Sequence, residues 1–162
     1  MLIRKAVPND AEKLVFLMKH VEESNVMLFE PGERNTTSQQ LNRRLTTMND
    51  SSIVFTAEEH NELVGYVFAI GEEIKRKQHS VYIVIGVHQA NRGKGTGTQL
   101  LRAVEKWAIE KALRRIELTV VAHNTLAIAL YEKLGFSLEG VKRDSLYIEG
   151  KYVDELYMSK LL

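Results

Sequence analysis

The segment from Val81 to Gly97 constrains the fold of this chain more than any other. It joins an apolar run, Val81–Val87, to the hexapeptide Arg92–Gly97, and a periodic stretch, Thr98–Ala112, follows. A short apolar run bounded by turn residues is typical of a buried strand. The apolar residues of the periodic stretch recur at helical spacing and are Leu100, Val104, Trp107 and Ala108. The segment therefore predicts a buried strand, a glycine turn and an amphipathic helix with Trp107 in the core.

The glycines of the turn indicate a phosphate site. Gly93, Gly95 and Gly97 favour a loop whose backbone can approach an anion closely. The helix start adds unpaired N–H groups and the positive end of a dipole. A P-loop is excluded, because it needs four residues between its first glycine and Gly-Lys-Ser/Thr. A dinucleotide fingerprint is disfavoured, because its spacing is G-x-G-x-x-G and Glu117 falls near the start of the next strand rather than at its end.

Composition narrows the class of protein. With 162 residues, 44% hydrophobic and 27% charged, the chain is predicted to form a single domain over residues 1–162. A net charge of +1 gives no sign of nucleic-acid binding, and no apolar stretch approaches the roughly twenty residues of a membrane span. The first residues lack a signal-peptide core, so we expect a cytoplasmic protein. Because cysteine is absent, there is no thiolate metal site and no cysteine nucleophile, and no metal is expected.

The remaining patterns predict an α/β domain. Further strands are predicted at Leu2–Lys5, Ile53–Ala57, Leu63–Ile70, Arg115–Val121, Phe136–Ile148 and Tyr152–Met158. Further helices are predicted after Asn9 or Asp10, after a capping box at Thr37–Gln40, and over Asn124–Leu134, which Gly135 ends. Hairpins flanking a β-α-β centre predict a mixed, mostly antiparallel central sheet with helices on both faces.

Two blocks of residues carry a family resemblance. Arg92, Gly95 and Gly97 fill the pattern Arg-x-x-Gly-x-Gly, and the second block consists of Asn124, Ala127, Tyr131 and Leu134-Gly135-Phe136. In this order they resemble the GNAT acetyltransferase superfamily, and the resemblance covers essentially the whole chain. It implies the acyl-CoA N-acyltransferase (GNAT) fold and acetyl-CoA as co-substrate. The acceptor would be a primary amine of a small molecule or of a protein N-terminus. A non-catalytic coenzyme A sensor of the same fold is the alternative.

The resemblance also implies cofactor contacts. The pyrophosphate would lie against the loop of Arg92, Gly93, Lys94, Gly95, Thr96, Gly97 and Thr98. The pantetheine arm would pair with the backbone of Ile85, Gly86 and Val87, and Gly86 is expected to permit a bulge that splays this strand. Asn124 would lie near the pantetheine amides, or act only as a helix N-cap. Tyr131, two helical turns further on, would protonate the coenzyme A thiolate, or serve only as a core aromatic. Without a cysteine nucleophile, transfer is expected to be direct.

The acceptor side is less well defined. Family members often place a glutamate base on the central strand, but Val81–Val87 contains no acid, so the base is unassigned. Glu30 and Glu72 are predicted to contact the acceptor. The base candidates are Glu72, Glu73, His79 and His123. The last hairpin carries Tyr147, Tyr152 and Tyr157, most of them expected to be packing residues, and its edge offers a route to a homodimer.

Overall fold

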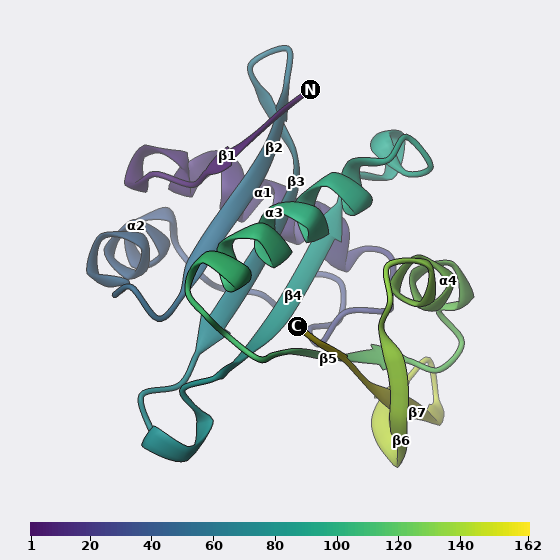
Figure 1. Cartoon of the computed structure of the whole chain (residues 1–162). Helices are drawn as coiled ribbons and strands as arrows, with labels where there is room; N and C mark the ends of the chain where they lie inside the picture. The colour runs from purple at the N-terminus through teal and green to yellow at the C-terminus, as the bar shows by residue number, and fades with distance from the viewer.

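A computed structural model describes all 162 residues and places seven strands in one sheet (Figure 1). The strands are β1 (Leu2–Lys5), β2 (Ile53–Glu59), β3 (Glu62–Gly71), β4 (Ser80–Val87), β5 (Arg115–Val121), β6 (Ser137–Ile148) and β7 (Lys151–Leu161). Their order across the sheet is β1-β2-β3-β4-β5-β7-β6. Only β4 and β5 run parallel; every other neighbouring pair is antiparallel. The predicted mixed, mostly antiparallel sheet is confirmed.

Four α-helices cover the two faces of the sheet. They are α1 (Ala11–Glu22), α2 (Ser38–Thr47), α3 (Thr96–Glu110) and α4 (Thr125–Lys133). One core cluster joins apolar residues of α3, including Trp107, to the sheet, and residues of α4 pack against it. A second cluster lies on the opposite face and joins α1 and Leu41 of α2 to β2 and β3. Figure 1 shows α3 crossing one face of the sheet and α1 lying behind it.

Local sequence signals set the helix boundaries. Thr37 and Gln40 form the predicted capping box, in which the Gln40 N–H donates to Thr37 Oγ1 at 3.1 Å and the Thr37 N–H donates to Gln40 Oε1 at 2.9 Å. Gly135 ends α4 with a φ of +93°. One boundary differs from the prediction: α3 begins at Thr96 rather than Thr98, because Gly95 adopts a left-handed conformation and acts as the N-cap. The helix thus starts inside the glycine motif.

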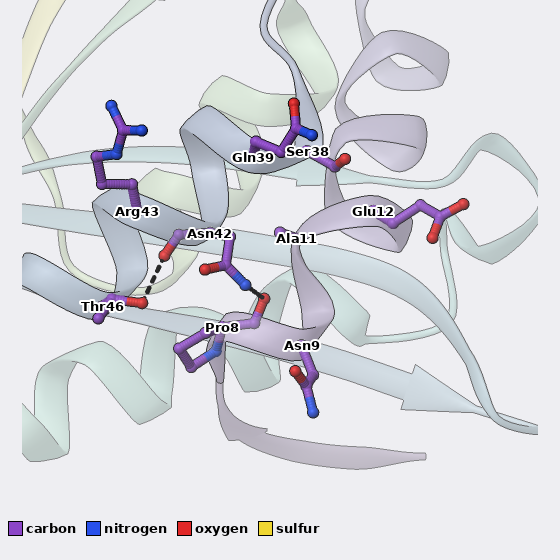
Figure 2. A pocket seen from close by; sticks show the side chains of 9 residues that line it. All are labelled: Pro8, Asn9, Ala11, Glu12, Ser38, Gln39, Asn42, Arg43 and Thr46. Atoms are coloured by element: carbon purple, nitrogen blue, oxygen red, sulfur yellow. Dashed lines mark hydrogen bonds between the residues drawn. The ribbon is translucent and has the colours of Figure 1, made fainter.

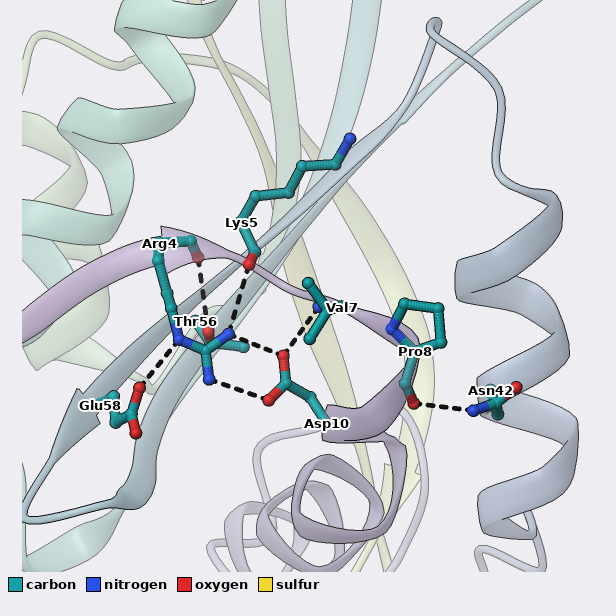
Figure 3. A network of polar contacts seen from close by, with 8 residues as sticks. All are labelled: Arg4, Lys5, Val7, Pro8, Asp10, Asn42, Thr56 and Glu58. Atoms are coloured by element: carbon teal, nitrogen blue, oxygen red, sulfur yellow. Dashed lines mark hydrogen bonds and ion pairs between the residues drawn. The ribbon is translucent and has the colours of Figure 1, made fainter.

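A charged network attaches β1 to the 3-10 turn η1 (Pro8–Asp10) that precedes α1 (Figure 3). Arg4 donates to both oxygens of Asp10, at 2.8 and 2.9 Å, and to Glu58 on β2 at 2.8 Å. The Val7 N–H also donates to Asp10, at 2.8 Å. The Arg4 hydrogen bonds hold the pKa of the Asp10 carboxyl below its usual range. This network fixes the N-terminal strand to the start of α1.

The final hairpin is more exposed than expected. Tyr147, Tyr152 and Tyr157 are 65%, 69% and 43% exposed, so the expectation that most of them are packing residues is wrong. The rings of Tyr147 and Tyr152 contact each other, with centroids 5.0 Å apart. They lie on a two-stranded extension that no helix covers. None of the helices combines the length and apolar character needed to cross a membrane.

Candidate active site

The two parallel strands separate along most of their length. Pairing between β4 and β5 covers only three register positions and ends at Tyr82↔Glu117. Beyond that point β4 continues to Val87 and β5 to Val121 without pairing to each other. Backbone N–H and C=O groups seek partners, so the facing strand edges suit a ligand that itself carries amides. We call this opening the split.

The glycine loop lies after the open end of β4. Gly93 and Gly95 have φ values of +73° and +83°, a region that strongly favours glycine. No side chain caps the start of α3, so its first N–H groups remain free for an anion. Arg92 and Lys94 are exposed beside them. Free N–H groups and basic side chains therefore lie close together in sequence at the start of α3, an arrangement that suits an anion.

Two residues of the loop serve packing. The Thr96 side chain is buried, and a Cβ on Gly65 of β3 would come within 3.0 Å of Thr96 Cγ2 and Leu100 Cδ1. A Cβ on Gly97 would come within 3.0 Å of Leu130 Cδ2 on α4. Both glycines allow α3 to approach its neighbours closely. Thr96 can thus offer a ligand its N–H but not its side chain.

The start of α4 lies beside the end of β5. Asn124 is its N-cap and accepts a hydrogen bond from the Ala127 N–H at 3.4 Å, leaving only its amide nitrogen free to donate. Tyr131 is 7% exposed and its ring contacts Phe136, with centroids 5.8 Å apart. Burial raises the pKa of Tyr131 above its usual range, and Tyr82 of β4 adds to this effect. Tyr131 is therefore a protonated phenol at neutral pH, with Tyr82 near enough to influence it.

Gly86 has a different role from the one expected. The β3–β4 register runs without a shift from Gly65↔Val87 to Gly71↔Val81, so the expected bulge at Gly86 is wrong, although β4 does separate from β5 as expected. A Cβ on Gly86 would lie 2.5 Å from Cζ and 2.6 Å from the hydroxyl oxygen of Tyr66, its register partner. Gly86 is a glycine because the Tyr66 ring occupies the space above it. The Tyr66 hydroxyl was not foreseen from the sequence.

The face of β4 that points away from α3 is partly open to solvent in the part of the strand that precedes Gly86. Tyr82 and Val84 lie on this face and are 37% and 38% exposed. The Tyr82 hydroxyl lies 2.6 Å from Thr119 Oγ1 on β5. This open face borders the split, and the hydroxyl groups of Tyr82 and Thr119 lie at its edge. We call it the acceptor face.

Two contacts hold chain segments beside the acceptor face. Arg34 lies in the segment between α1 and α2, and Glu22 lies at the end of α1. The Arg34 Nε donates to both carboxylate oxygens of Glu22, at 2.8 and 3.0 Å, and the Arg34 Nη2 lies 2.7 Å from Glu22 Oε2. Asn25 donates to Glu149 in the β6–β7 turn at 2.6 Å. The first contact is partly buried and the second exposed. Together they tie the α1–α2 segment to α1 and to the last hairpin.

The structure does not bring all the predicted acceptor residues together. Glu30 is exposed in the α1–α2 segment, where its N–H donates to Glu33 Oε1 at 3.2 Å. Glu72 follows the end of β3, beside the closed end of the split rather than its open end. Glu73 is bound by Asn49 at 2.5 Å. His79 and His123 are exposed. None of these positions identifies the base.

A histidine pair adjoins the glycine loop. The rings of His20 and His88 stack with centroids 3.9 Å apart and an interplanar angle of 11°. The Ala90 N–H donates to His88 Nδ1 at 3.0 Å. Burial, followed by the neighbouring His20 and Arg92, lowers the pKa of His88. The pair fixes the first turn after β4 against the end of α1.

A groove of about 520 Å³ lies away from these residues, between the start of α1 and α2 (Figure 2). Its lining is mostly polar, and Asn42 donates to the Pro8 carbonyl across it at 2.9 Å. It contains no residue of the glycine loop, the split or the acceptor face. It is a gap between two helix surfaces and adds nothing to the site.

The site combines an open pair of parallel strands with a glycine-led helix start and a second helix start. This arrangement suits an elongated molecule that carries phosphate and amide groups. The chain belongs to the acetyltransferase (GNAT) family, whose sequence profile matches residues 12–136. The family assignment made from the two residue blocks is confirmed.

Individual proteins support the same assignment. The chain is 30% identical over 104 residues to an L-amino acid N-acetyltransferase of Escherichia coli, covering 62% of each chain. An uncharacterised N-acetyltransferase of Bacillus subtilis is 26% identical, and 54% of its length is covered. The chain thus spans little more than half of these curated relatives. A GNAT acetyltransferase structure from Streptococcus pneumoniae is 31% identical with a TM-score of 0.94, covering 99% of this chain and 98% of that one.

Proposed function

We propose that this protein transfers the acetyl group of acetyl-CoA directly to a primary amine. The observation that carries the proposal is the split between β4 and β5, which opens beside the uncapped start of α3. The pyrophosphate would bind the N–H groups from Gly93 to Thr98, with charge from Arg92 and Lys94. The pantetheine amides would bind the free edge of β4 at Ile85, Gly86 and Val87.

The chemistry of the site fits this transfer. The amine nitrogen attacks the thioester carbon from the acceptor face, and the carbon–sulfur bond breaks. The amine proton passes to water, and the departing thiolate takes a proton from the Tyr131 hydroxyl, which regains one from solvent. Burial raises the pKa of Tyr131, so its hydroxyl carries a proton and can donate a hydrogen bond to the developing thiolate as the proton is transferred.

The acceptor is proposed to be a small-molecule or peptide amine that enters over the acceptor face. Support comes from the exposed side chains of Tyr82 and Val84 and from the relatives, one of which acts on L-amino acids according to its name. Glu30 lies in a segment that can contact such an acceptor, whereas the position of Glu72 offers it less support.

A panel of amines tests the proposal. The protein is incubated with acetyl-CoA and each amine, and both free thiol and acetylated amine are measured. We expect thiol and product to appear in equal amounts for at least one amine. Tight coenzyme A binding without turnover on any amine would instead indicate the sensor alternative.

A further inference from the structure

We propose that Tyr66 is a catalytic residue whose hydroxyl contacts the attacking amine. This inference rests on the proposed acetyl transfer and adds to it a group on the acceptor face. Tyr66 lies on β3, and neither residue block of the family resemblance includes it. Three observations support the assignment: the direction of its ring, the state of its hydroxyl and the charges around it.

The ring of Tyr66 extends across β4. Its register partner on β4 is Gly86, and Cζ and the hydroxyl oxygen lie within 2.6 Å of where a Gly86 Cβ would stand. Neighbouring strands are about 4.8 Å apart, so the end of the Tyr66 side chain reaches from β3 to a position over the neighbouring strand, β4. It lies over the part of β4, Ile85 to Val87, that borders the open split. The hydroxyl therefore lies beside the strand edge that is proposed to hold the pantetheine arm, whose end carries the thioester.

The Tyr66 hydroxyl is available to a ligand. Tyr66 is only 2% exposed, and its hydroxyl makes no hydrogen bond within the chain. Yet the only fully buried side-chain oxygen or nitrogen without a partner is Ser24 Oγ. The small exposed area of Tyr66 must therefore include its hydroxyl oxygen. A nearly buried phenol with an open, unpaired hydroxyl suits a bound polar group.

The surroundings keep this hydroxyl protonated. Burial, and then the negative charge of Glu22, raise the pKa of Tyr66 above its usual range, while Arg34 acts in the opposite direction. Glu22 and Arg34 neutralise each other through their partly buried ion pair. The Arg34 Nη1 also donates to Thr36 Oγ1 at 3.1 Å, so its donors are largely occupied. Tyr66 thus offers an unpaired hydroxyl beside an ion pair whose two charges balance each other.

These features define the step. The neutral amine donates one N–H to the Tyr66 oxygen, which directs the nitrogen lone pair toward the thioester carbon. The new carbon–nitrogen bond forms as the carbon–sulfur bond breaks, the nitrogen loses its proton to water, and Tyr131 protonates the thiolate. Tyr66 keeps its own proton throughout, so it orients the nucleophile and is not the base.

Tyr66→Phe tests the role, because it removes the hydroxyl and leaves the ring over Gly86. We expect kcat/KM for the amine to fall about 10- to 100-fold, the effect of losing one hydrogen bond to the reacting group. The Kd for coenzyme A should not rise and the melting temperature should not fall, since the hydroxyl has no partner in the folded chain. The shape of the pH profile should also stay the same. Thr47→Val, which removes a hydroxyl on the outer side of α2, is the control and should leave kcat/KM unchanged.

Gly86→Ala provides a second variant, because its methyl group would displace the Tyr66 ring. If Gly86→Ala lowers kcat/KM by displacing Tyr66, the double variant with Tyr66→Phe and Gly86→Ala should have the same kcat/KM as Gly86→Ala alone. The inference is overturned if Tyr66→Phe turns over within twofold of the wild type, if it loses stability and coenzyme A binding together, or if the two substitutions are additive. Failure of the wild type to acetylate any amine would instead overturn the proposed function, and this inference with it.

Discussion

The hydroxyl of Tyr82 lies 2.6 Å from Oγ1 of Thr119, and this bond joins β4 to β5 just beyond their last paired residues. The register partner of Tyr82 is Glu117, two residues before Thr119. The side chain therefore leans along the strand to reach its partner. A side-chain bond thus marks the closed end of the split, where backbone pairing stops.

Removing this hydrogen bond should lower the stability of the fold slightly, and the effects of removing either partner should be coupled. Tyr82→Phe and Thr119→Val are each expected to lower the free energy of unfolding by about 0.5 to 1.5 kcal/mol, toward the lower end because Tyr82 is partly exposed. Urea titration of both single variants and the double variant measures the coupling. The loss in the double variant should be smaller than the sum of the single losses; strict additivity would show that the bond does not form.

Tyr131→Phe should slow the reaction without weakening coenzyme A binding. It removes the acid that protonates the thiolate, so kcat is expected to fall about 100-fold or more. Its ring still packs against Phe136, so stability should be kept. Steady-state kinetics and calorimetric titration with coenzyme A measure the two effects. An unchanged kcat would assign Tyr131 to the core alone.

The raised pKa of Tyr131 predicts that this residue adds no pH dependence to kcat below pH 9. Burial raises this pKa, so the proton is held more tightly in the folded protein than in the unfolded chain. The phenol therefore stays protonated up to and beyond the ordinary tyrosine pKa of about 10. No loss of kcat between pH 7 and 9 should arise from Tyr131. A decline in that range that disappears in Tyr131→Phe would contradict this.

The glycine loop can be tested with a matched pair of variants. Gly95 and Gly150 have φ values of +83° and +78°, and each has open space where a Cβ would stand. Alanine should therefore introduce similar backbone strain, roughly 1 kcal/mol, at both. Only Gly95→Ala should weaken coenzyme A binding, by about tenfold, because it disturbs the start of α3. Equal affinities for the two variants in calorimetry would show that the loop does not hold the cofactor.

Asp10 should make the fold sensitive to acid. Its folded-state pKa is lowered by Arg4, so the unfolded chain takes up protons more readily. The stabilisation is present above pH 4 and is lost as the pH falls through the lower, folded-state pKa. Asp10→Asn should lower the free energy of unfolding at pH 7 by about 1 to 3 kcal/mol and flatten its decline in acid. Asp50→Asn, in an exposed loop, should change neither.

Most of the fold could be predicted from the sequence because its signals are local. The strand at Arg115–Val121, the capping box at Thr37 and the glycine that ends α4 depend on neighbouring residues and match the structure. The start of α3 was missed by two residues because a glycine in the left-handed region can itself be an N-cap.

The acceptor side could not be predicted because it depends on contacts between distant strands. The register that places Tyr66 beside Gly86 is set by the whole β3–β4 pairing, and no spacing within either strand reveals it. The ion pair of Glu22 with Arg34 likewise joins a helix to an irregular segment. The glycine at position 86 is visible in the sequence, but a glycine within a strand is compatible both with a bulge and with a side chain packed closely against it.

Initial rates with both substrates varied test the central claim of direct acetyl transfer most directly. The rate of thiol release is measured over a matrix of acetyl-CoA and amine concentrations for the best amine. If both substrates occupy the split and the acceptor face together, the double-reciprocal lines intersect. Parallel lines would show that the acetyl group first moves to the protein, which would contradict the account.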